Sequence, residues 1–318
     1  MGLLVIVVLT FPALLLVSLL IDSVRRENLA STRTLLFVVL YLISEAYGLG
    51  GAIVLWLKYR LSDHHTAADF VTWNYRLQWK WAHFLVATSS RIFQMKWEIE
   101  NDPAGGQGPA LIFMQHSSVA DTLLPIHLLS YPFGLRLKYV MKRELLWDPS
   151  IDVVGQRLEN FFVDRKSTRR LSQIKALRAM VSDLKSDEAA LIYPEGTRAT
   201  AAKRARIVAE LERTGKTEQL AYAKSLTWLL PPHMGGAMTF LDSAPGADVL
   251  FCAHFGFQGS ARFSDVWHGN LVGKIIRLKF WRCSGSEVPT AASERSKWFL
   301  ERWANMDAWL KDQALQNE

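Results

Sequence analysis

The sequence predicts an α/β fold, a mixed, mostly parallel sheet flanked by helices, with membrane helices at its N-terminal end. Along residues 110–315, short apolar runs of strand length alternate with longer helical patterns. This alternation is typical of buried strands whose sheet is covered by helices. The beginning of the chain differs, because residues 3–21 are uncharged and almost wholly apolar. As a helix, such a run crosses roughly 30 Å of hydrocarbon.

Residues 1–58 are the predicted membrane anchor. Leu3–Ile21 is the stronger candidate for a transmembrane helix, and a secretory signal is disfavoured by its length and by the missing small-residue cleavage site. In Leu35–Leu57, the second apolar run, Glu45 and the cluster Gly48–Gly51 interrupt the pattern, so this run is either shallow or spanning. Basic residues between and after the two runs favour one crossing, with the following domain on the cytoplasmic side.

Composition predicts an anionic, membrane-like partner. The chain has a formal charge of +7, a pI near 9.4 and twelve Trp. Trp rings favour the membrane interface, and no nucleic-acid-binding module is recognisable, so we expect an anionic membrane surface and no nucleic acid. Residues 59–102 are the richest in interleaved Trp and basic residues, and we expect interfacial helices that also pack under the domain. A purely structural core helix fits the same residues.

The Pro- and Gly-rich segment at residues 103–109 is the expected boundary of a globular domain over residues 103–318. The expected strands are Ala110–Met114, Arg136–Met141, Asn160–Val163, Ala189–Tyr193, Leu226–Leu230, Val249–His254 and Leu271–Phe280. The expected helices are Val119–Leu129, Ser167–Leu184 and Glu294–Leu315, and residues 69–100 are also helix-like. The sequence contains no paired-Cys metal motif, P-loop or dinucleotide fingerprint, so we expect no metal and no cofactor.

The first chemical motif lies where the strand at residues 110–114 gives way to a helix. His116 is followed five residues later by Asp121. From the start of the helix, the Asp121 carboxylate is able to reach the imidazole of His116, fix its tautomer and stabilise its charged form. His116 is then a general base for a substrate that brings its own hydroxyl. A helix-capping histidine with an unrelated aspartate gives the same pattern.

The second motif, Tyr193–Arg198, also ends a predicted strand. Gly196 allows a tight turn, Thr197 supplies a hydroxyl, and Arg198 presents a planar fork for phosphate or carboxylate. Glu195 is able to hold the loop by accepting backbone or arginine donors. A capped turn with a surface arginine is the plain alternative.

These motifs resemble those of the glycerolipid acyltransferases, the 1-acylglycerol-3-phosphate and lysophospholipid acyltransferases, and particularly the branch that includes lysocardiolipin acyltransferases. The resemblance covers roughly Trp73 to Leu310 in ordered blocks. These blocks are His116 with Asp121, Lys142–Pro149, Phe161–Arg165, Glu195–Arg198 and Leu229–Gly236. In the last block, His233 stands where this branch commonly has arginine.

The resemblance implies a glycerol-3-phosphate acyltransferase-like fold and an enzyme that transfers a fatty acyl group to a lysophospholipid hydroxyl. The expected donor is acyl-CoA or acyl-carrier protein, and the expected acceptor is 1-acylglycerol-3-phosphate. It makes His116 and Asp121 catalytic. The residues implied to bind substrate are Glu195, Gly196, Thr197, Arg198, Arg165, Lys142 and Pro232. The alternatives are another lysolipid acceptor, or an inactive membrane-anchored lipid-binding protein on the same fold.

Overall fold

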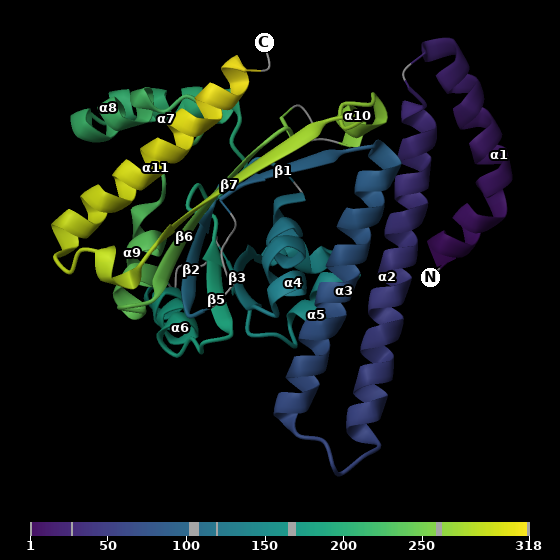
Figure 1. Cartoon of the computed structure of the whole chain (residues 1–318), viewed down its shortest axis with the longest axis horizontal. Helices are drawn as coiled ribbons and strands as arrows, with labels where there is room; N and C mark the ends of the chain where they lie inside the picture. The colour runs from purple at the N-terminus through teal and green to yellow at the C-terminus, as the bar shows by residue number, and fades with distance from the viewer. Residues whose placement is uncertain are drawn as a thin grey trace.

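A seven-stranded sheet forms the centre of the computed structural model, which describes residues 2–26, 28–101, 108–118, 120–164, 170–258 and 263–316 (Figure 1). The strands are β1 (Lys96–Glu100), β2 (Ala110–Met114), β3 (Arg136–Lys142), β4 (Phe161–Val163), β5 (Glu188–Ile192), β6 (Asp248–Phe255) and β7 (Ile275–Cys283). Their spatial order is β1-β7-β6-β2-β5-β3-β4. Every neighbouring pair is parallel except β6 and β7. The predicted mixed, mostly parallel sheet is therefore confirmed.

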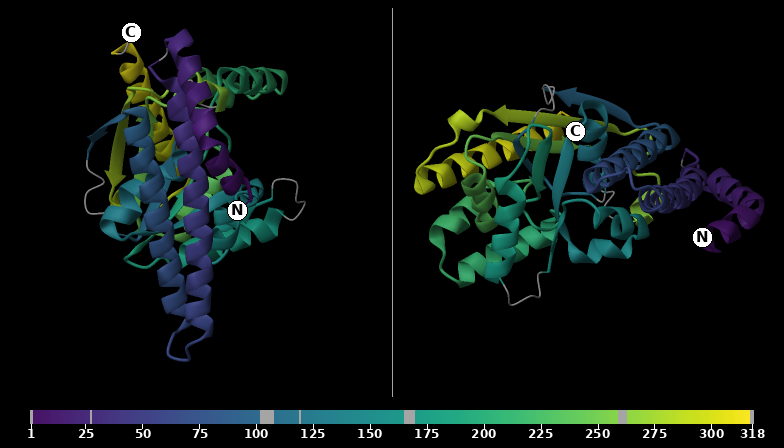
Figure 2. Two further views of the ribbon diagram at one scale, coloured as in Figure 1. Left: turned by 90° about the vertical axis from the view of Figure 1, so that its right-hand side faces the viewer. Right: turned by 90° about the horizontal axis from the view of Figure 1, so that it is seen from below.

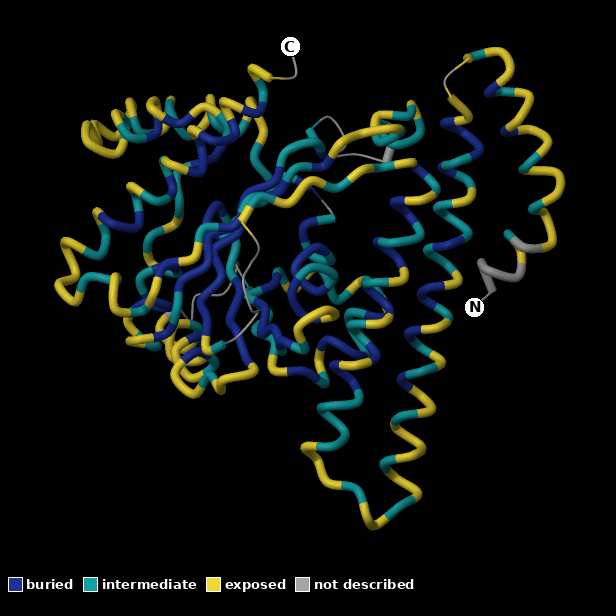
Figure 3. The backbone as a smooth tube through the Cα atoms, in the orientation of Figure 1, coloured by how far each residue is buried: buried dark blue, intermediate teal, exposed yellow. Residues whose placement is uncertain are grey.

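Alternate residues of β2 enter two different cores, so the sheet is buried on both faces. Ile112 and Met114 pack with α3 (Ala67–Phe93), while Leu111 and Phe113 pack with helices of the opposite layer. That layer contains α6 (Arg170–Ser182), α9 (Met234–Ser243) and α11 (Ala292–Leu315). Figure 3 shows the buried residues concentrated along these central strands. A strand covered on both faces is a rigid support for the loops at its ends.

The remaining helices are shorter and lie around the sheet. They are α4 (Tyr131–Phe133), α5 (Pro149–Gly155), α7 (Ala201–Arg213), α8 (Thr217–Ser225) and α10 (Phe263–Trp267). Short 3₁₀ turns occur at Arg143–Trp147 and Gly285–Glu287. In Figure 1, α7 and α8 lie on the side of the sheet opposite the N-terminal helices, and the Tyr222 hydroxyl of α8 donates to the carbonyl of Leu300 in α11 over 3.0 Å.

The N-terminal part of the chain forms three long helices, α1 (Gly2–Arg25), α2 (Ala30–Arg60) and α3, which run side by side (Figure 2). Hydrogen bonds fasten α2 to the start of α5. The Tyr41 hydroxyl donates to Oδ2 of Asp148 over 2.7 Å, and the backbone N–H of Ser150 donates to Oε2 of Glu45 over 3.2 Å. The helix α2 therefore lies along the sheet domain, and the end of its hairpin with α3 projects beyond it.

Among the residues whose side chains the structure describes, α2 is the one helix long and apolar enough to cross a membrane. Large apolar side chains are exposed on its outer surface, including Ile53, Val54 and Leu57. The predicted crossing at residues 3–21 lies in α1, whose first side chains are outside the described set, so it stays a prediction. The predicted boundary near residues 103–109 also stays a prediction, and β1, which precedes it, pairs with β7 inside the same sheet.

The helix predicted through residue 100 ends earlier, which is a correction. The helix α3 stops at Phe93, because Gln94 takes a left-handed conformation with φ 55° and its N–H bonds back to the last turn. The next residues, Lys96–Glu100, form the edge strand β1. The aromatic and basic residues of this stretch suit a helix locally, and pairing with β7 overrides that preference.

Two further predicted elements differ from the structure. Residues 226–230 are a loop, because the N–H groups of residues 227–229 donate to the Asp307 carboxylate instead of to a strand. The helix expected at residues 119–129 is a 3₁₀ turn at Ala120–Thr122 followed by a π-helical stretch at Ile126–Ser130. The helical stretch continues through α4 to Phe133, so a helix is present here but begins later than expected and is of mixed type.

Candidate active site

Two polar loops meet at the carboxyl ends of the central strands. β2 and β5 are parallel neighbours, and Phe113 pairs with Ile192. The loops begin just beyond this pair, so both emerge at the same edge of the sheet. The backbone N–H of Ala199 donates to the carbonyl of His116 over 2.7 Å and joins the second loop to the first. The pairing of β2 with β5 therefore brings the two motifs together at one edge of the sheet.

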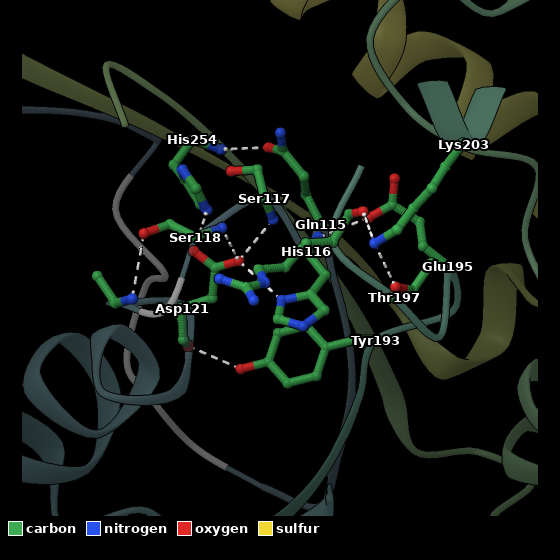
Figure 4. A network of polar contacts seen from close by, with 12 residues as sticks. Gln115, His116, Ser117, Ser118, Asp121, Tyr193, Glu195, Thr197, Lys203 and His254 are labelled. Atoms are coloured by element: carbon green, nitrogen blue, oxygen red, sulfur yellow. Dashed lines mark hydrogen bonds and ion pairs between the residues drawn. The ribbon is translucent and has the colours of Figure 1, made fainter. Parts of the chain in front are cut away.

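The first loop holds a histidine–aspartate pair, shown in Figure 4. Nδ1 of His116 lies 3.0 Å from Oδ2 of Asp121. The same oxygen accepts the backbone N–H groups of Ser117 at 2.6 Å and Ser118 at 2.9 Å. Because an ionised carboxylate has no hydrogen to donate, Nδ1 carries the hydrogen and the Nε2 lone pair is the one available to a substrate proton. The His116 side chain is 17% exposed, so the base is accessible.

Asp121 is fully buried and kept ionised by its neighbours. Burial raises the pKa of its carboxyl, but the electrostatic influence of His254 and the hydrogen bonds from His116 and His254 outweigh burial and hold that pKa well below its usual range. Oδ1 of Asp121 lies 2.9 Å from Nε2 of His254, a fully buried residue of β6. The Tyr193 hydroxyl donates to the carbonyl of Asp121 over 2.7 Å. Groups from three strand ends therefore hold this one aspartate.

A second buried carboxyl group, that of Glu195, connects the loops. Its Oε2 accepts the backbone N–H of His116 at 2.6 Å, and its Oε1 accepts that of Leu230 at 2.8 Å. Burial, reinforced by the charge of Asp121 and opposed by these two hydrogen bonds, raises the pKa of Glu195 to about 8. At neutral pH the group is therefore mostly uncharged, and a neutral carboxyl still accepts hydrogen bonds. Glu195 fixes the backbone of the base without adding much negative charge beside Asp121.

The loop that carries Leu230 is held from the far end of the chain. The buried Asp307 of α11 accepts the N–H groups of residues 227–229 at 2.7 Å each. Nε1 of Trp303 donates to the carbonyl of Leu230 over 3.1 Å. These contacts position the Leu230 N–H that reaches Glu195. Helix α11 therefore supports the site without touching it.

A cavity of about 370 Å³ opens beside the two loops. It combines basic side chains with an apolar wall. Its lining residues are His116, Thr122, Val140, Met141, Lys142, Leu145, Val163, Ile192, Tyr193, Pro194, Gly196, Arg198, His233 and Gly236. A cavity with one accessible base, several cationic groups and apolar surface suits a substrate that has both an anionic group and a hydrocarbon chain.

Comparison with known proteins agrees with this geometry. A profile of the family described as Acyltransferase matches residues 64–241, which include both polar loops. The chain belongs to the Acyltransferase family. The fold of this acyltransferase is similar to the crystal structure of PlsC from Thermotoga maritima, a 1-acyl-sn-glycerophosphate (LPA) acyltransferase. The TM-score is 0.56 at 13% identity, and the match covers 90% of this chain and 98% of PlsC. No curated protein matches the chain in sequence.

Several sequence-predicted residues of the acyltransferase come together at the cavity. His116, Lys142, Gly196 and Arg198 line it. Gly196 has a φ of 63°, as a tight turn requires, and its N–H donates to the carbonyl of Tyr193 over 2.9 Å.

The other predicted residues that the structure describes do not line the cavity. Asp121 and Glu195 are buried next to it, and Pro232 precedes the lining residue His233. Thr197 is engaged elsewhere, because its Oγ1 accepts from Nζ of Lys203 over 2.7 Å. Arg165 lies outside the described residues.

Sequence reasoning missed three residues that build the site. These residues come from three other elements. His254 of β6 contacts Asp121, Lys203 of α7 donates to Thr197, and Asp307 of α11 accepts from the loop at residues 227–229. Only His254 had a usable signal, since its strand was predicted and a histidine at a strand end is a common position for a working side chain. The backbone N–H groups of Ser117 and Ser118 donate to Asp121.

Proposed function

We propose that this acyltransferase moves a fatty acyl group from an acyl thioester to the free hydroxyl of a lysophospholipid. The observation that carries the proposal is the His116–Asp121 contact of 3.0 Å at a cavity that Arg198 and Lys142 also line. An oriented base next to cationic side chains matches an acceptor that has a hydroxyl near a phosphate. The acceptor supported best is 1-acylglycerol-3-phosphate, because the similar fold of PlsC is described with that substrate.

In the proposed reaction, the acceptor hydroxyl gives its proton to Nε2 of His116 while its oxygen attacks the thioester carbonyl carbon. The new C–O bond forms a tetrahedral intermediate, and the C–S bond then breaks. The imidazolium returns the proton to the departing thiolate. Asp121 stabilises the imidazolium through Nδ1 and remains ionised throughout, as its lowered pKa requires.

Recognition of the acceptor phosphate is assigned to Arg198, with Lys142 as a second cation and Arg165 as a third candidate. Arg198 offers paired donors that fit phosphate oxygens, whereas Lys142 acts as a point charge. Both residues line the same cavity as the base. His233 adds an imidazole, whose charge depends on pH, at the position where the related branch has arginine. The presence of His233 in place of arginine favours a second candidate acceptor, a lysolipid other than the phosphate monoester.

We further propose that the enzyme works on an anionic membrane surface, with the catalytic domain on the cytoplasmic side. Exposed Ile53, Val54 and Leu57 on α2 provide apolar contact with lipid, and Lys58 stacks over the Trp73 ring at 3.9 Å. Because α2 is fastened along the domain, this arrangement supports shallow insertion of α2.

The proposal is tested with the full chain purified in detergent. Thiol release from acyl-CoA and from acyl-carrier protein is followed with and without each member of a lysolipid panel. We expect release to depend on the acceptor and to be fastest with 1-acylglycerol-3-phosphate. Release that prefers another lysolipid would reassign the acceptor, and binding of lysolipid without thiol release from either donor would identify an inactive lipid-binding protein.

A further inference from the structure

The two oxygens of the Asp121 carboxylate have unequal support. Oδ2 receives three donors, His116 and the N–H groups of Ser117 and Ser118. Oδ1 has one polar neighbour among the described residues, Nε2 of His254 at 2.9 Å. The ring approaches obliquely, outside the geometry of a regular hydrogen bond, and both side chains are fully buried. His254 is therefore the polar neighbour of this oxygen among the described residues.

The contact requires a hydrogen on Nε2 of His254. Two lone pairs at 2.9 Å in a buried site repel each other, and a buried carboxylate oxygen without a donor is costly. Two further contacts fix this part of β6. The backbone N–H of His254 donates to Oε1 of Gln115 at 3.0 Å, and the ring of Phe257 packs edge-on against the imidazole with centroids 5.4 Å apart. His254 is thus a buried residue that places Nε2 beside Oδ1 of Asp121.

We propose that His254 is a positioning residue for acyl transfer. By holding Oδ1, it prevents the Asp121 carboxylate from turning about its Cβ–Cγ bond and keeps Oδ2 aligned with Nδ1 of His116. The inference rests on the proposed roles of His116 and Asp121. His254 does not line the cavity, so its effect is on turnover rather than on substrate binding.

The first test compares His254→Leu with His254→Gln in the full-length enzyme. Leu removes the donor, whereas the Gln amide carries an N–H at a reach similar to that of Nε2. We expect His254→Leu to lower kcat about 10- to 100-fold, the usual penalty of a misplaced catalytic group, with KM changed less than about 2-fold. His254→Gln should recover most of the lost turnover.

Thermal stability separates positioning from packing. A leucine suits this buried strand position better than a glutamine, so a purely structural role predicts that His254→Leu is the more active and more stable variant. Of the two variants, we expect His254→Leu to have the higher melting temperature and His254→Gln to have the higher kcat. Phe251→Leu is the matched control, since Phe251 is a buried β6 residue of the other core, and it should lower stability without changing kcat. Equal kcat in His254→Leu and the wild type overturns the proposal.

A double-mutant cycle shows whether His254 acts through Asp121. In an Asp121→Asn background, His254→Leu should cost less than about 3-fold in kcat, because the group that it orients is already gone. The same loss in both backgrounds overturns the proposal. If His254→Leu does not fold, His254→Gln should exceed His254→Asn in kcat about 10-fold, because the shorter amide does not reach Oδ1. Equal values for these two variants also refute it.

The outcome is independent of the broader assignment. If His116→Ala retains turnover, the proposed function fails whatever His254 does. If His116→Ala is inactive and His254→Leu is fully active, the function stands and only the role of His254 is wrong.

Discussion

Replacing Asp307 by Asn should destabilise the enzyme and slow it, although Asp307 lies on α11 and does not line the cavity. Its Oδ1 accepts the N–H groups of Trp228 and Leu229, and its Oδ2 accepts that of Thr227. In Asp307→Asn, one oxygen still accepts two N–H groups, but an NH₂ group replaces the other oxygen and faces the Thr227 N–H. Two donors then oppose each other in a buried site.

The expected loss can be worked out from these contacts. A hydrogen bond to a charged group contributes about 1.5–3 kcal/mol, and the Thr227 bond is lost. The two remaining bonds become neutral and weaken, since charge-assisted bonds are roughly twice as strong. The free energy of unfolding should therefore fall by about 2–4 kcal/mol. This corresponds to a drop of about 5–12 °C in Tm for a chain of this size.

The measurement is thermal unfolding of the purified proteins in the same detergent, together with kcat. The control is Asp312→Asn, an exposed acidic residue on the same helix, which should change stability by less than about 0.5 kcal/mol. We expect kcat to fall as well, because the Asp307 loop positions Leu230, whose N–H reaches Glu195. A Tm within 2 °C of the wild type, as a rough threshold, or an equal loss in Asp312→Asn, refutes this reasoning.

Three other predictions follow from the site and the α2 surface. In the folded protein, the pKa of Glu195 is about 8 against an ordinary value of 4.5, so the folded state keeps a proton that the unfolded chain releases. The stabilisation from Glu195 is therefore full below pH 4.5 and is lost as pH rises through 8. The difference in Tm between wild type and Glu195→Gln should shrink over this pH range. A difference that stays constant contradicts the prediction. Arg198→Lys should raise the KM for the acceptor about tens-fold, equivalent to about 1.5–3 kcal/mol, with little change in the KM for the donor. A rise confined to the KM for the donor would assign Arg198 to the thioester carrier. Changing Ile53, Val54 and Leu57 together to Gln should weaken binding to anionic vesicles and leave a residual affinity that falls with salt. Unchanged binding to the vesicles would exclude this face of α2 from the membrane contact.

Features coded by neighbouring residues could be predicted from the sequence. His116 and Asp121 lie on one short loop, and each predicted strand of the central sheet is a short apolar run between breakers. β2, β3, β5 and β6 were therefore predicted within a residue or two of their observed bounds. The parallel pairing of β2 and β5 then brings the second motif to the first.

Features that depend on distant partners could not be predicted. Residues 226–230 form an apolar run, and their loop conformation is determined by Asp307, about eighty residues further along the chain. The contact of His254 with Asp121 requires the order of β6 beside β2, which no local pattern contains. The residues of the edge strand β1 suit both helix and strand, and pairing with β7 decides between the two structures.

The role of His116 as general base is tested most directly by thioester consumption with purified His116→Ala enzyme and a lysophospholipid acceptor. We expect acceptor-dependent thiol release to be abolished, while circular dichroism and binding to anionic vesicles match the wild type, because only the base is removed. Acceptor-dependent release at the wild-type rate from correctly folded His116→Ala protein would contradict the assignment of His116 as the general base and, with it, the proposed mechanism.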